Sequence, residues 1–543
     1  FFHGFCSASL TPFDPPPRLP MAPVAADRLV PPGGRVCIVG GGTTGLLAAK
    51  ACLEEGLQPT IFERTLQVGG VWRLDDAHGR VAYESLYTNS SGTMMNISDF
   101  PLASRLQGHF PRRQDICEYY EEYVRRFGLG EHLRFGAEVK SVRRQGASWA
   151  VTAVGRPSGE EEALHFDAVF ICTGQFHVPT VPEMPGAESF AGRIRHSSEY
   201  RSASDLSGKR VVVVGIGNSA LDISLEAARA GATVVVACRS GTNVIPVADH
   251  RGRPIDQMMN TRFYNSLPAS LRNALFYRLV YGTNAEFQRS GMPPPRGGAG
   301  SQGFSNLKEH VEYKRLLRQG RIRFVAGAIQ NVCKKSVTIG TADVEADEVV
   351  LCTGYRLSFP FLAPELAKGF APEAGSHPCL NAYKQVMHPS EHTLCALGFI
   401  LTYGNESCVG EMQARWALAH WVGRSKLPSA SVVAADLQKR QKARKYPQFV
   451  PYIGYMDGLA VGCGAAPPLS WATLLMDPLL FWKIQMAPVV PAQYRLAGEH
   501  GWPAASDFVR ALPTTALRWV EQLWAPPHHA GATPAAPPPP ARL

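Results

Sequence analysis

Residues 35–64 read RVCIVGGGTTGLLAAKACLEEGLQPTIFER and decide the fold of the first part of the chain. An apolar run predicts a buried strand, and the motif Gly40-x-Gly42-x-x-Gly45 follows it directly, ahead of small and apolar residues at helical spacing. In such a unit the glycines allow a tight turn, close backbone approach to a pyrophosphate and close helix–strand packing, while the helix N-terminus favours the anion. The next predicted strand ends at Glu63, where a carboxylate can accept hydrogen bonds from ribose hydroxyls. Together these features predict a dinucleotide-binding domain of the Rossmann type.

A second copy of this pattern lies at residues 209–241, which read KRVVVVGIGNSALDISLEAARAGATVVVACRSG. Its loop is Gly215-x-Gly217-x-x-Ala220, and its second predicted strand ends at Arg239, where the first copy has an acid. An acid would repel a 2′-phosphate, whereas an arginine holds it by charge-assisted hydrogen bonds. Such bonds are worth roughly 1.5–3 kcal/mol each, so one arginine could favour NADPH over NADH by about 10- to 100-fold. The alternative is that Arg239 is an ordinary surface charge.

The first site is therefore predicted to bind FAD and the second to bind NADPH. The residues expected to bind FAD are Gly40, Gly41, Gly42, Thr43, Thr44, Gly45 and Glu63. Those expected to bind NADPH are Gly215, Gly217, Asn218, Ser219, Ala220 and Arg239.

Two further predicted strands bracket the second copy, and each ends in a threonine–glycine pair, Thr173-Gly174 and Thr353-Gly354. The simplest arrangement is an α/β fold of two Rossmann-like dinucleotide-binding domains, with the NADPH domain inserted into the FAD domain. The expected order is a disordered leader (1–33), the FAD domain (34–178), the NADPH domain (179–324), the second part of the FAD domain (325–445), a C-terminal helical, substrate-side region (446–524) and a disordered Pro/Ala-rich tail (525–543). The first twenty residues are proline-rich and contain no methionine, so Met21 is the more natural start.

Composition narrows the class of protein further. At 543 residues the chain is too long for one hydrophobic core, and its net charge of +10 is mild for this length. The densest basic cluster, residues 437–446, is typical of a solvated helix face, so no nucleic-acid partner is predicted. Twelve cysteines occur without a C-x-x-C pair or a zinc-like spacing, which predicts reduced thiols in the cytoplasm and no metal site.

No run of about 18 apolar residues is present, which is the length that a membrane-spanning helix needs. The nearest candidate, residues 474–486, is interrupted by Asp477, Pro478 and Lys483. Peripheral contact with the endoplasmic reticulum membrane remains open, through an amphipathic surface near residues 471–488.

The connector between the two domains, residues 190–200, has the pattern Phe190-x-Gly192-x-x-x-His196-x-x-x-Tyr200. With two glycine loops in this order, two threonine–glycine strand ends and this connector, the sequence resembles the flavin-containing monooxygenases, which are class B flavoprotein monooxygenases. Other resembling elements extend the match from Arg35 to about Trp502. They are Gly69-Gly70-Val71-Trp72, the asparagine-bearing segment 85–101, and the animal-type C-terminal blocks EMQARWA (411–417) and QYRLAG (493–498).

This resemblance implies an enzyme that uses FAD, NADPH and molecular oxygen. NADPH reduces the flavin, oxygen forms a flavin 4a-hydroperoxide, and a soft nitrogen or sulfur atom of a small molecule takes one oxygen atom, as in N,N-dimethylaniline monooxygenases. The resemblance adds Gly70, Val71, Trp72, Thr88 and Asn89 to the cofactor-binding residues. It also implies that Asn89 supports the oxygenated intermediate and is the catalytic residue, although an asparagine in a serine-rich loop also suits an Asx-turn.

Several alternatives stay open from the sequence. His196 is expected to order a hinge that couples the two cofactor sites, and the alternative is a general base. The related Baeyer–Villiger monooxygenases, which act on ketones, share every cofactor feature, but their connector typically ends in tryptophan where this chain has Tyr200. A flavin-dependent disulfide reductase would need a redox-active cysteine pair, and a non-catalytic flavoprotein would not need both Glu63 and Arg239.

Overall fold

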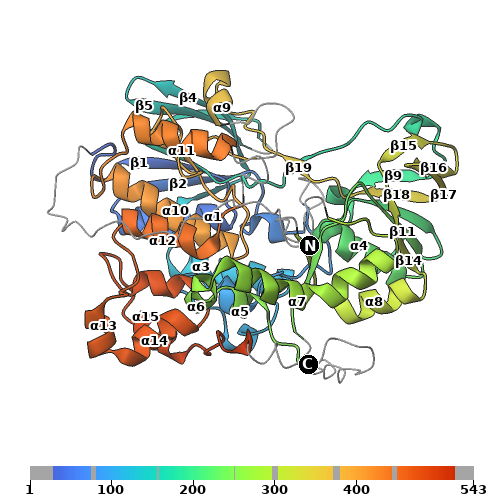
Figure 1. Ribbon diagram of the computed structural model, residues 1–543. Coiled ribbons are helices and arrows are strands. Elements are labelled where there is room, and N and C mark those ends of the chain that lie inside the picture. The colour runs from blue at the N-terminus through green and yellow to red at the C-terminus, as the bar shows by residue number, and fades with distance from the viewer. Residues whose placement is uncertain are drawn as a thin grey trace, which may run out of the picture.

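The computed structural model describes residues 28–74, 81–155, 158–249, 251–295, 304–370, 379–442 and 449–519. The predicted leader up to residue 27 and the predicted tail at residues 525–543 lie outside this part. Two five-stranded parallel sheets lie at opposite ends of the molecule, and a group of helices spans the space beneath them (Figure 1). The predicted α/β fold with two Rossmann-like domains is confirmed.

The first sheet has the strand order β20-β7-β1-β2-β3. Its strands are β1 (Arg35–Val39), β2 (Gln58–Glu63), β3 (Leu133–Phe135), β7 (Ala168–Ile171) and β20 (Leu394–Ala396). Side chains alternate across a strand, so Val36 and Ile38 pack against helices α1 (Thr43–Glu54) and α10 (Glu406–Trp421). Cys37 and Val39 pack on the opposite face, which is covered by the antiparallel strands β4 (Ala137–Gln145), β5 (Ser148–Gly155) and β6 (Glu161–Phe166).

The second sheet has the strand order β14-β11-β10-β18-β9. Its strands are β9 (Arg193–His196), β10 (Arg210–Val214), β11 (Thr233–Cys238), β14 (Ile322–Ala326) and β18 (Glu348–Leu351). Helix α4 (Asn218–Arg229) follows β10 and packs against this sheet. The other face is covered by a small antiparallel sheet of β15 (Ile329–Val332), β16 (Ser336–Ile339) and β17 (Ala342–Glu345).

One predicted domain boundary is wrong. We expected residues 325–445 to form the second part of the first domain, but β18 pairs in parallel with β10, with Val212 opposite Val349. The chain returns to the first domain only after Leu351, through Thr353-Gly354. The reason is that both threonine–glycine exits follow equally apolar buried strands, and such a run carries no information about which sheet it joins. The other boundaries stay predictions.

The connections between the two domains lie side by side. Strand β8 (Val178–Pro179) leaves the first domain, strand β19 (Tyr355–Arg356) returns to it, and the two pair in antiparallel fashion. Both crossings between the domains therefore run through one two-stranded ribbon.

The remaining elements are mainly helical. They are α2 (Gly92–Met95), α3 (Arg113–Arg126), β12 (Asn243–Pro246), α5 (Asp256–Met259), α6 (Arg262–Ser266), α7 (Ala269–Arg289), β13 (Phe304–Leu307), α8 (His310–Arg318), α9 (Pro364–Phe370), α11 (Ala430–Lys442), α12 (Tyr452–Gly462), α13 (Trp471–Met476), α14 (Pro478–Met486) and α15 (Ala505–Ala511). Helices α12 to α15 form the C-terminal region beside α5 and α6 (Figure 1). Among the described residues, every helix is too short or too polar to span a bilayer.

A buried ion cluster attaches the C-terminal region to the first domain. Arg495, whose side chain is 1% exposed, donates hydrogen bonds to Glu54 of α1 (2.7 Å) and to Glu411 of α10 (2.8 Å). Burial raises the pKa of the Glu411 carboxyl, but the charges of Arg495 and Arg415 lower it more, so the net pKa lies below its ordinary value.

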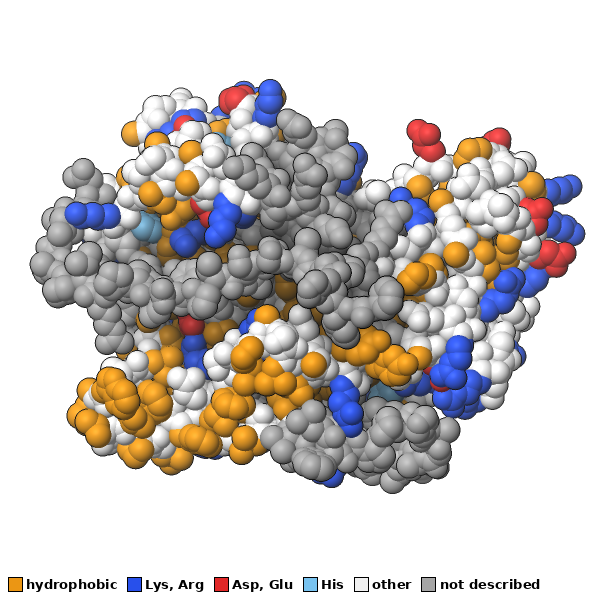
Figure 2. Space-filling view, in the orientation of Figure 1, with side chains coloured by type: hydrophobic (Ala, Val, Ile, Leu, Met, Phe, Trp, Pro, Cys, Tyr) orange, Lys and Arg blue, Asp and Glu red, His pale blue; other side chains and the backbone are white. Residues whose placement is uncertain are grey.

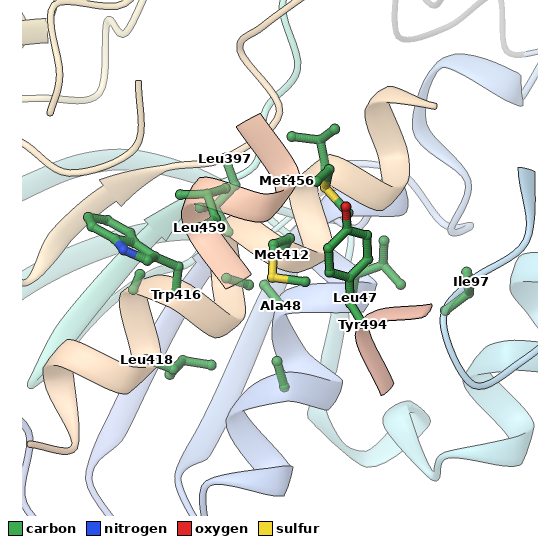
Figure 3. Close-up of a cluster of buried hydrophobic side chains, with 14 of the residues drawn as sticks. Leu47, Ala48, Ile97, Leu397, Met412, Trp416, Leu418, Met456, Leu459 and Tyr494 are labelled. Atoms are coloured by element: carbon green, nitrogen blue, oxygen red, sulfur yellow. The ribbon is translucent and has the colours of Figure 1, made fainter. Parts of the chain in front are cut away.

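Figure 3 shows the apolar core in which α1, α10 and α12 meet. The labelled residues include Leu47, Ala48, Met412, Trp416, Met456, Leu459 and Tyr494.

We expect Arg495→Ala to lower the free energy of unfolding by about 3–5 kcal/mol, because Glu411 would stay buried without its hydrogen-bonded counter-ion. The loss is measured by urea unfolding of the FAD-loaded enzyme. Since the folded pKa of Glu411 is lowered, its stabilising contribution is present above its ordinary pKa and is lost as the pH falls through the lowered value. The control is Arg105→Ala, which breaks an exposed pair with Asp115 and should cost only about 0–1 kcal/mol. Equal losses in the two variants would contradict the prediction.

Candidate cofactor and substrate site

A cavity of about 1000 Å³ lies between the two domains, at the carboxyl ends of strands from both sheets. Open α/β sheets bind ligands at this edge. The first glycine loop lines the cavity with Gly40, Gly42, Thr43 and Thr44, and the second with Ile216, Gly217 and Asn218. The structure therefore brings the two predicted cofactor loops to one shared space.

The helices that follow the two loops begin without a side-chain cap. Gly42 is the N-cap residue of α1 and Gly217 is that of α4, and neither position can offer a side-chain acceptor to the first backbone N–H groups. These N–H groups need an acceptor, and a pyrophosphate at a helix N-terminus satisfies them while meeting the positive end of the helix dipole. The two loops thus fit two dinucleotides.

The glycines of the loops are required for different reasons. A Cβ atom on Gly45 would lie 2.0 Å from the Gly40 carbonyl oxygen, and one on Gly215 would lie 2.4 Å from the Cys352 carbonyl oxygen. The protein's own packing therefore excludes any side chain at these two positions. A Cβ on Gly217 would meet nothing within 4 Å, so the open space beside it is available for a ligand.

Glu63 is held in a fixed orientation at the end of β2. Its Oε2 accepts a hydrogen bond from the Gly41 backbone N–H (2.8 Å), and its Oε1 accepts from the Thr65 backbone N–H (2.9 Å) and hydroxyl (2.7 Å). The side chain lines the cavity. A carboxylate at this place on the cavity wall is of the type that accepts hydrogen bonds from the ribose hydroxyls of a bound dinucleotide.

Asn89 lines the cavity next to Thr88, whose hydroxyl donates to the Ser90 carbonyl oxygen (2.7 Å). The Asn89 Oδ1 atom is buried and accepts no hydrogen bond from the described residues. An Asx-turn requires that atom to accept a backbone N–H, so the geometry does not support the turn alternative. A buried acceptor without a donor costs about 1–3 kcal/mol, and a bound ligand that donates a hydrogen bond would remove this cost.

The other predicted site residues divide into two groups. Gly70, Val71 and Trp72 form a short 3₁₀ turn that lines the cavity. The predicted residues that do not line it are Gly41, Gly45, Gly215, Ser219, Ala220 and Arg239. Arg239 is exposed at the end of β11, directly before Ser240 and Gly241, which do line the cavity.

Sequence reasoning missed several parts of the cavity wall, among them residues 137–140 of β4 and the segment around the start of α10. Residues Leu401, Thr402 and 404–407 lie in the loop after β20 and in the first turn of α10, and they line the cavity without belonging to any motif that we recognised. The nearest signal was the EMQARWA block in α10, which lies just beyond this loop. The second glycine loop also has an unpredicted support, because Asn218 Oδ1 accepts the backbone N–H of Asn306 (2.8 Å).

His196 lies where the second sheet meets the interdomain ribbon. It ends β9, its side chain is buried, and its ring contacts Tyr355 of β19 edge-on, with 5.2 Å between ring centroids. Its Nδ1 accepts the Ser198 backbone N–H (3.1 Å), and burial lowers the pKa of the ring. His196 does not line the cavity, so the structure gives no support to a role as general base there.

Polar contacts between the domains fix the position of the Asn89 segment relative to α4. Tyr83 and Ser85, which precede Asn89, donate hydrogen bonds to Asp222 and Glu226 of α4. Tyr200 of the connector also donates to Glu226 (2.6 Å). The segment that carries Asn89 is therefore attached to the helix of the second cofactor loop.

Comparison with known proteins gives the family of this chain. The family model described as flavin-binding monooxygenase-like matches residues 33–524. Dimethylaniline monooxygenase (N-oxide-forming) 2 of Macaca mulatta is 32% identical over 500 residues, which are 88% of this chain and 91% of that protein. Flavin-containing monooxygenase 3 of Homo sapiens is 31% identical over 528 residues, covering 91% of this chain and 95% of that protein.

Solved structures share the fold. S-allyl-L-cysteine S-oxygenase from Allium sativum aligns with a TM-score of 0.58 at 24% identity, over 79% of this chain and 88% of that one. Cyclohexanone monooxygenase from Rhodococcus sp. Phi1 bound to NADP⁺ aligns with a TM-score of 0.58 at 18% identity, over 79% and 97%.

The fold and the shared cavity fit an enzyme that binds two dinucleotides. The chain belongs to the flavin-binding monooxygenase-like family and is an NADPH-dependent flavin-containing monooxygenase. The predicted resemblance, the cofactors FAD and NADPH, and a reaction of molecular oxygen with a small molecule are confirmed.

Proposed function

We propose that this enzyme transfers one oxygen atom from O₂ to soft nucleophilic nitrogen or sulfur atoms of small molecules. The observation that carries the use of two cofactors in this reaction is that both uncapped helix N-termini open on one cavity. The relatives named N-oxide-forming, at 31–32% identity, support oxygenation of nitrogen. The ketone-oxidising structural neighbours are 18% identical and share the fold alone.

Bound FAD supplies the chemistry that links NADPH oxidation to the delivery of one oxygen atom. In this proposal the N–H groups at the start of α1 hold the FAD pyrophosphate, and Glu63 accepts the ribose hydroxyls. The N–H groups of α4 hold the NADPH pyrophosphate. Asn89 presents its unpartnered Oδ1 to the hydrogen-bond donors of the bound cofactors.

We assign His196 to a positioning role at the hinge. Its contact with Tyr355 joins the last strand of the second sheet to the returning crossing, so a movement of the ribbon moves the NADPH domain with it.

The proposed reaction is tested on three substrates with the purified FAD-loaded enzyme, NADPH and oxygen. We expect N-oxide from N,N-dimethylaniline and sulfoxide from methyl phenyl sulfide, each formed with consumption of NADPH. Cyclohexanone should give no lactone. Lactone formation in place of the other products would favour the Baeyer–Villiger alternative, and hydrogen peroxide as the sole product would reject both.

Arg239 is proposed to hold the 2′-phosphate of NADPH. We expect Arg239→Ala to raise the NADPH concentration for half-maximal flavin reduction by about 10- to 100-fold, with little change for NADH, because charge-assisted hydrogen bonds would be lost. Rapid mixing under anaerobic conditions measures both. The matched control is Arg323→Ala, an exposed arginine on the neighbouring strand β14. If Arg239→Ala weakened NADPH and NADH binding equally, Arg239 would not be the residue that binds the 2′-phosphate.

We also propose that helices α13 and α14 dock on the surface of the endoplasmic reticulum membrane. Trp471, Leu475 and Met476 are 80%, 80% and 82% exposed, and Trp482 follows them on α14. Figure 2 shows hydrophobic side chains gathered at this corner of the molecule with few charges among them. Tryptophan favours the membrane–water interface, and the net charge of +10 suits an anionic bilayer.

Replacing Trp471, Leu475 and Met476 together by serine should reduce binding to anionic phospholipid vesicles at least about 10-fold, because each buried apolar side chain contributes about 1.5–3 kcal/mol. Vesicle co-sedimentation measures this loss. Val181→Ser, at an exposed apolar residue far along the sequence, is the control and should bind normally. Unchanged vesicle binding by the triple variant would reject membrane docking. A wild-type dimer that these substitutions dissociate would also reject it, because the apolar surface would then bind a second copy of the chain.

A further inference from the structure

The first turn of α10 carries an acidic side chain that the proposed reaction has not used. Glu406 lines the cavity together with Asn405 and Ser407. Its carboxyl group makes no hydrogen bond or ion pair with the described residues. Because the side chain stays partly exposed at a deep position in the protein, the space that it faces is the cavity.

The turn that holds Glu406 is rigidly placed. Asn405 caps the helix by accepting the Ser407 backbone N–H (2.9 Å), and its Nδ2 donates to the Met94 carbonyl oxygen (3.2 Å). Gly404 packs closely against the start of α12, because a Cβ atom at this position would lie 2.2 Å from the Tyr452 ring. The segment 88–96, which carries Asn89, is therefore bonded to the turn that carries Glu406.

The surroundings of Glu406 favour a carboxyl that changes its protonation state. Burial raises its pKa to about 8. The titratable groups on the elements around this turn are Tyr120 of α3, Tyr452 of α12, Asp256 of α5, and Cys408 and Glu411 of α10. Burial raises the pKa of Asp256 to about 6. The charged or titratable residues elsewhere on the cavity wall are Glu63, Arg64, Glu138, Lys140, Cys172 and His177.

We propose that Glu406 binds basic amine substrates as ammonium ions and accepts their N–H proton before oxygenation. This inference rests on the proposed oxygenation of nitrogen. An alkylamine has a pKa of about 10 and enters mostly as the ammonium ion, whose nitrogen has no lone pair to attack an oxygen atom. A neutral amine is therefore needed at the point of reaction.

The proton transfer balances without any further reagent. The ammonium N–H bond breaks with its electron pair left on nitrogen, and the proton forms an O–H bond on the Glu406 carboxylate. An ion pair becomes two neutral groups, and the burial that raises the pKa of Glu406 favours its neutral form. The pKa of the alkylammonium ion lies about 2 units above that of Glu406, whereas it lies about 6 units above that of an ordinary glutamate. The proton passes to water when the product leaves.

Three substrates distinguish a role of Glu406 in deprotonating amines from an effect of Glu406 on the turnover of every substrate. N,N-dimethylbenzylamine is a strong base and carries a proton at neutral pH, N,N-dimethylaniline is a weak base and is neutral, and methyl phenyl sulfide has no basic nitrogen. At pH 8, where about half of Glu406 is ionised, the kcat/KM for dimethylbenzylamine should fall about 10- to 100-fold in Glu406→Gln, the range for one charge-assisted hydrogen bond. The values for dimethylaniline and the sulfide should not change.

The pH dependence of kcat/KM gives a second test of this role. In the wild-type enzyme kcat/KM for dimethylbenzylamine should stop rising above about pH 8, where Glu406 is ionised. In Glu406→Gln it should keep rising with the fraction of neutral amine. Glu406→Asp should recover part of the activity, and Glu183→Gln, the same change on an exposed residue, should behave as wild type. Flavin content confirms that each variant is folded.

Either an equal loss with all three substrates or no loss with any would overturn the inference. Wild-type enzyme that oxygenates neither dimethylaniline nor the sulfide would instead reject the proposed function itself. If both are oxygenated and dimethylbenzylamine turnover is independent of Glu406, only this inference fails.

Discussion

The constraint on which this structure depends is the meeting of two helix N-termini at one cavity. Helices α1 and α4 each begin at a glycine that offers no cap, so the backbone N–H groups there remain available to a phosphate. Such groups can serve two cofactors in one reaction only if both sheets turn their carboxyl ends to the same space. The insertion of the second domain into the first achieves this, because both crossings lie together in β8 and β19.

The same arrangement explains the polar contacts far from the glycine loops. Asp222 and Glu226 of α4 accept hydrogen bonds from the segment that leads to Asn89, and Arg495 attaches the C-terminal helices to α1 and α10. Each contact fixes one wall of the cavity relative to another. A flavin monooxygenase needs these walls to keep their positions, because water that enters the cavity during the reaction allows side reactions that consume the oxygen without forming product.

Local motifs were predictable from the sequence, and long-range pairing was not. Gly45 and Gly215 could be recognised because strand, turn and helix are adjacent in the chain, and their close contacts with Gly40 and Cys352 explain why they must be glycine. The membership of β18 could not be recognised, because Val349 and Val350 would be equally buried in either sheet. Glu406 escaped notice because the wall that it belongs to is assembled from residues far apart in the chain, and nothing in its local sequence marks it.

The most direct test of the central claim is whether hydride passes between the two cofactors inside this cavity. The FAD-loaded enzyme is mixed under anaerobic conditions with NADPH, or with NADPH deuterated at the transferred position, and the loss of flavin absorbance is followed. Direct transfer predicts that the flavin is reduced and that deuterium slows the reduction. Flavin that stays oxidised, or reduction at the same rate with both forms of NADPH, would contradict the account.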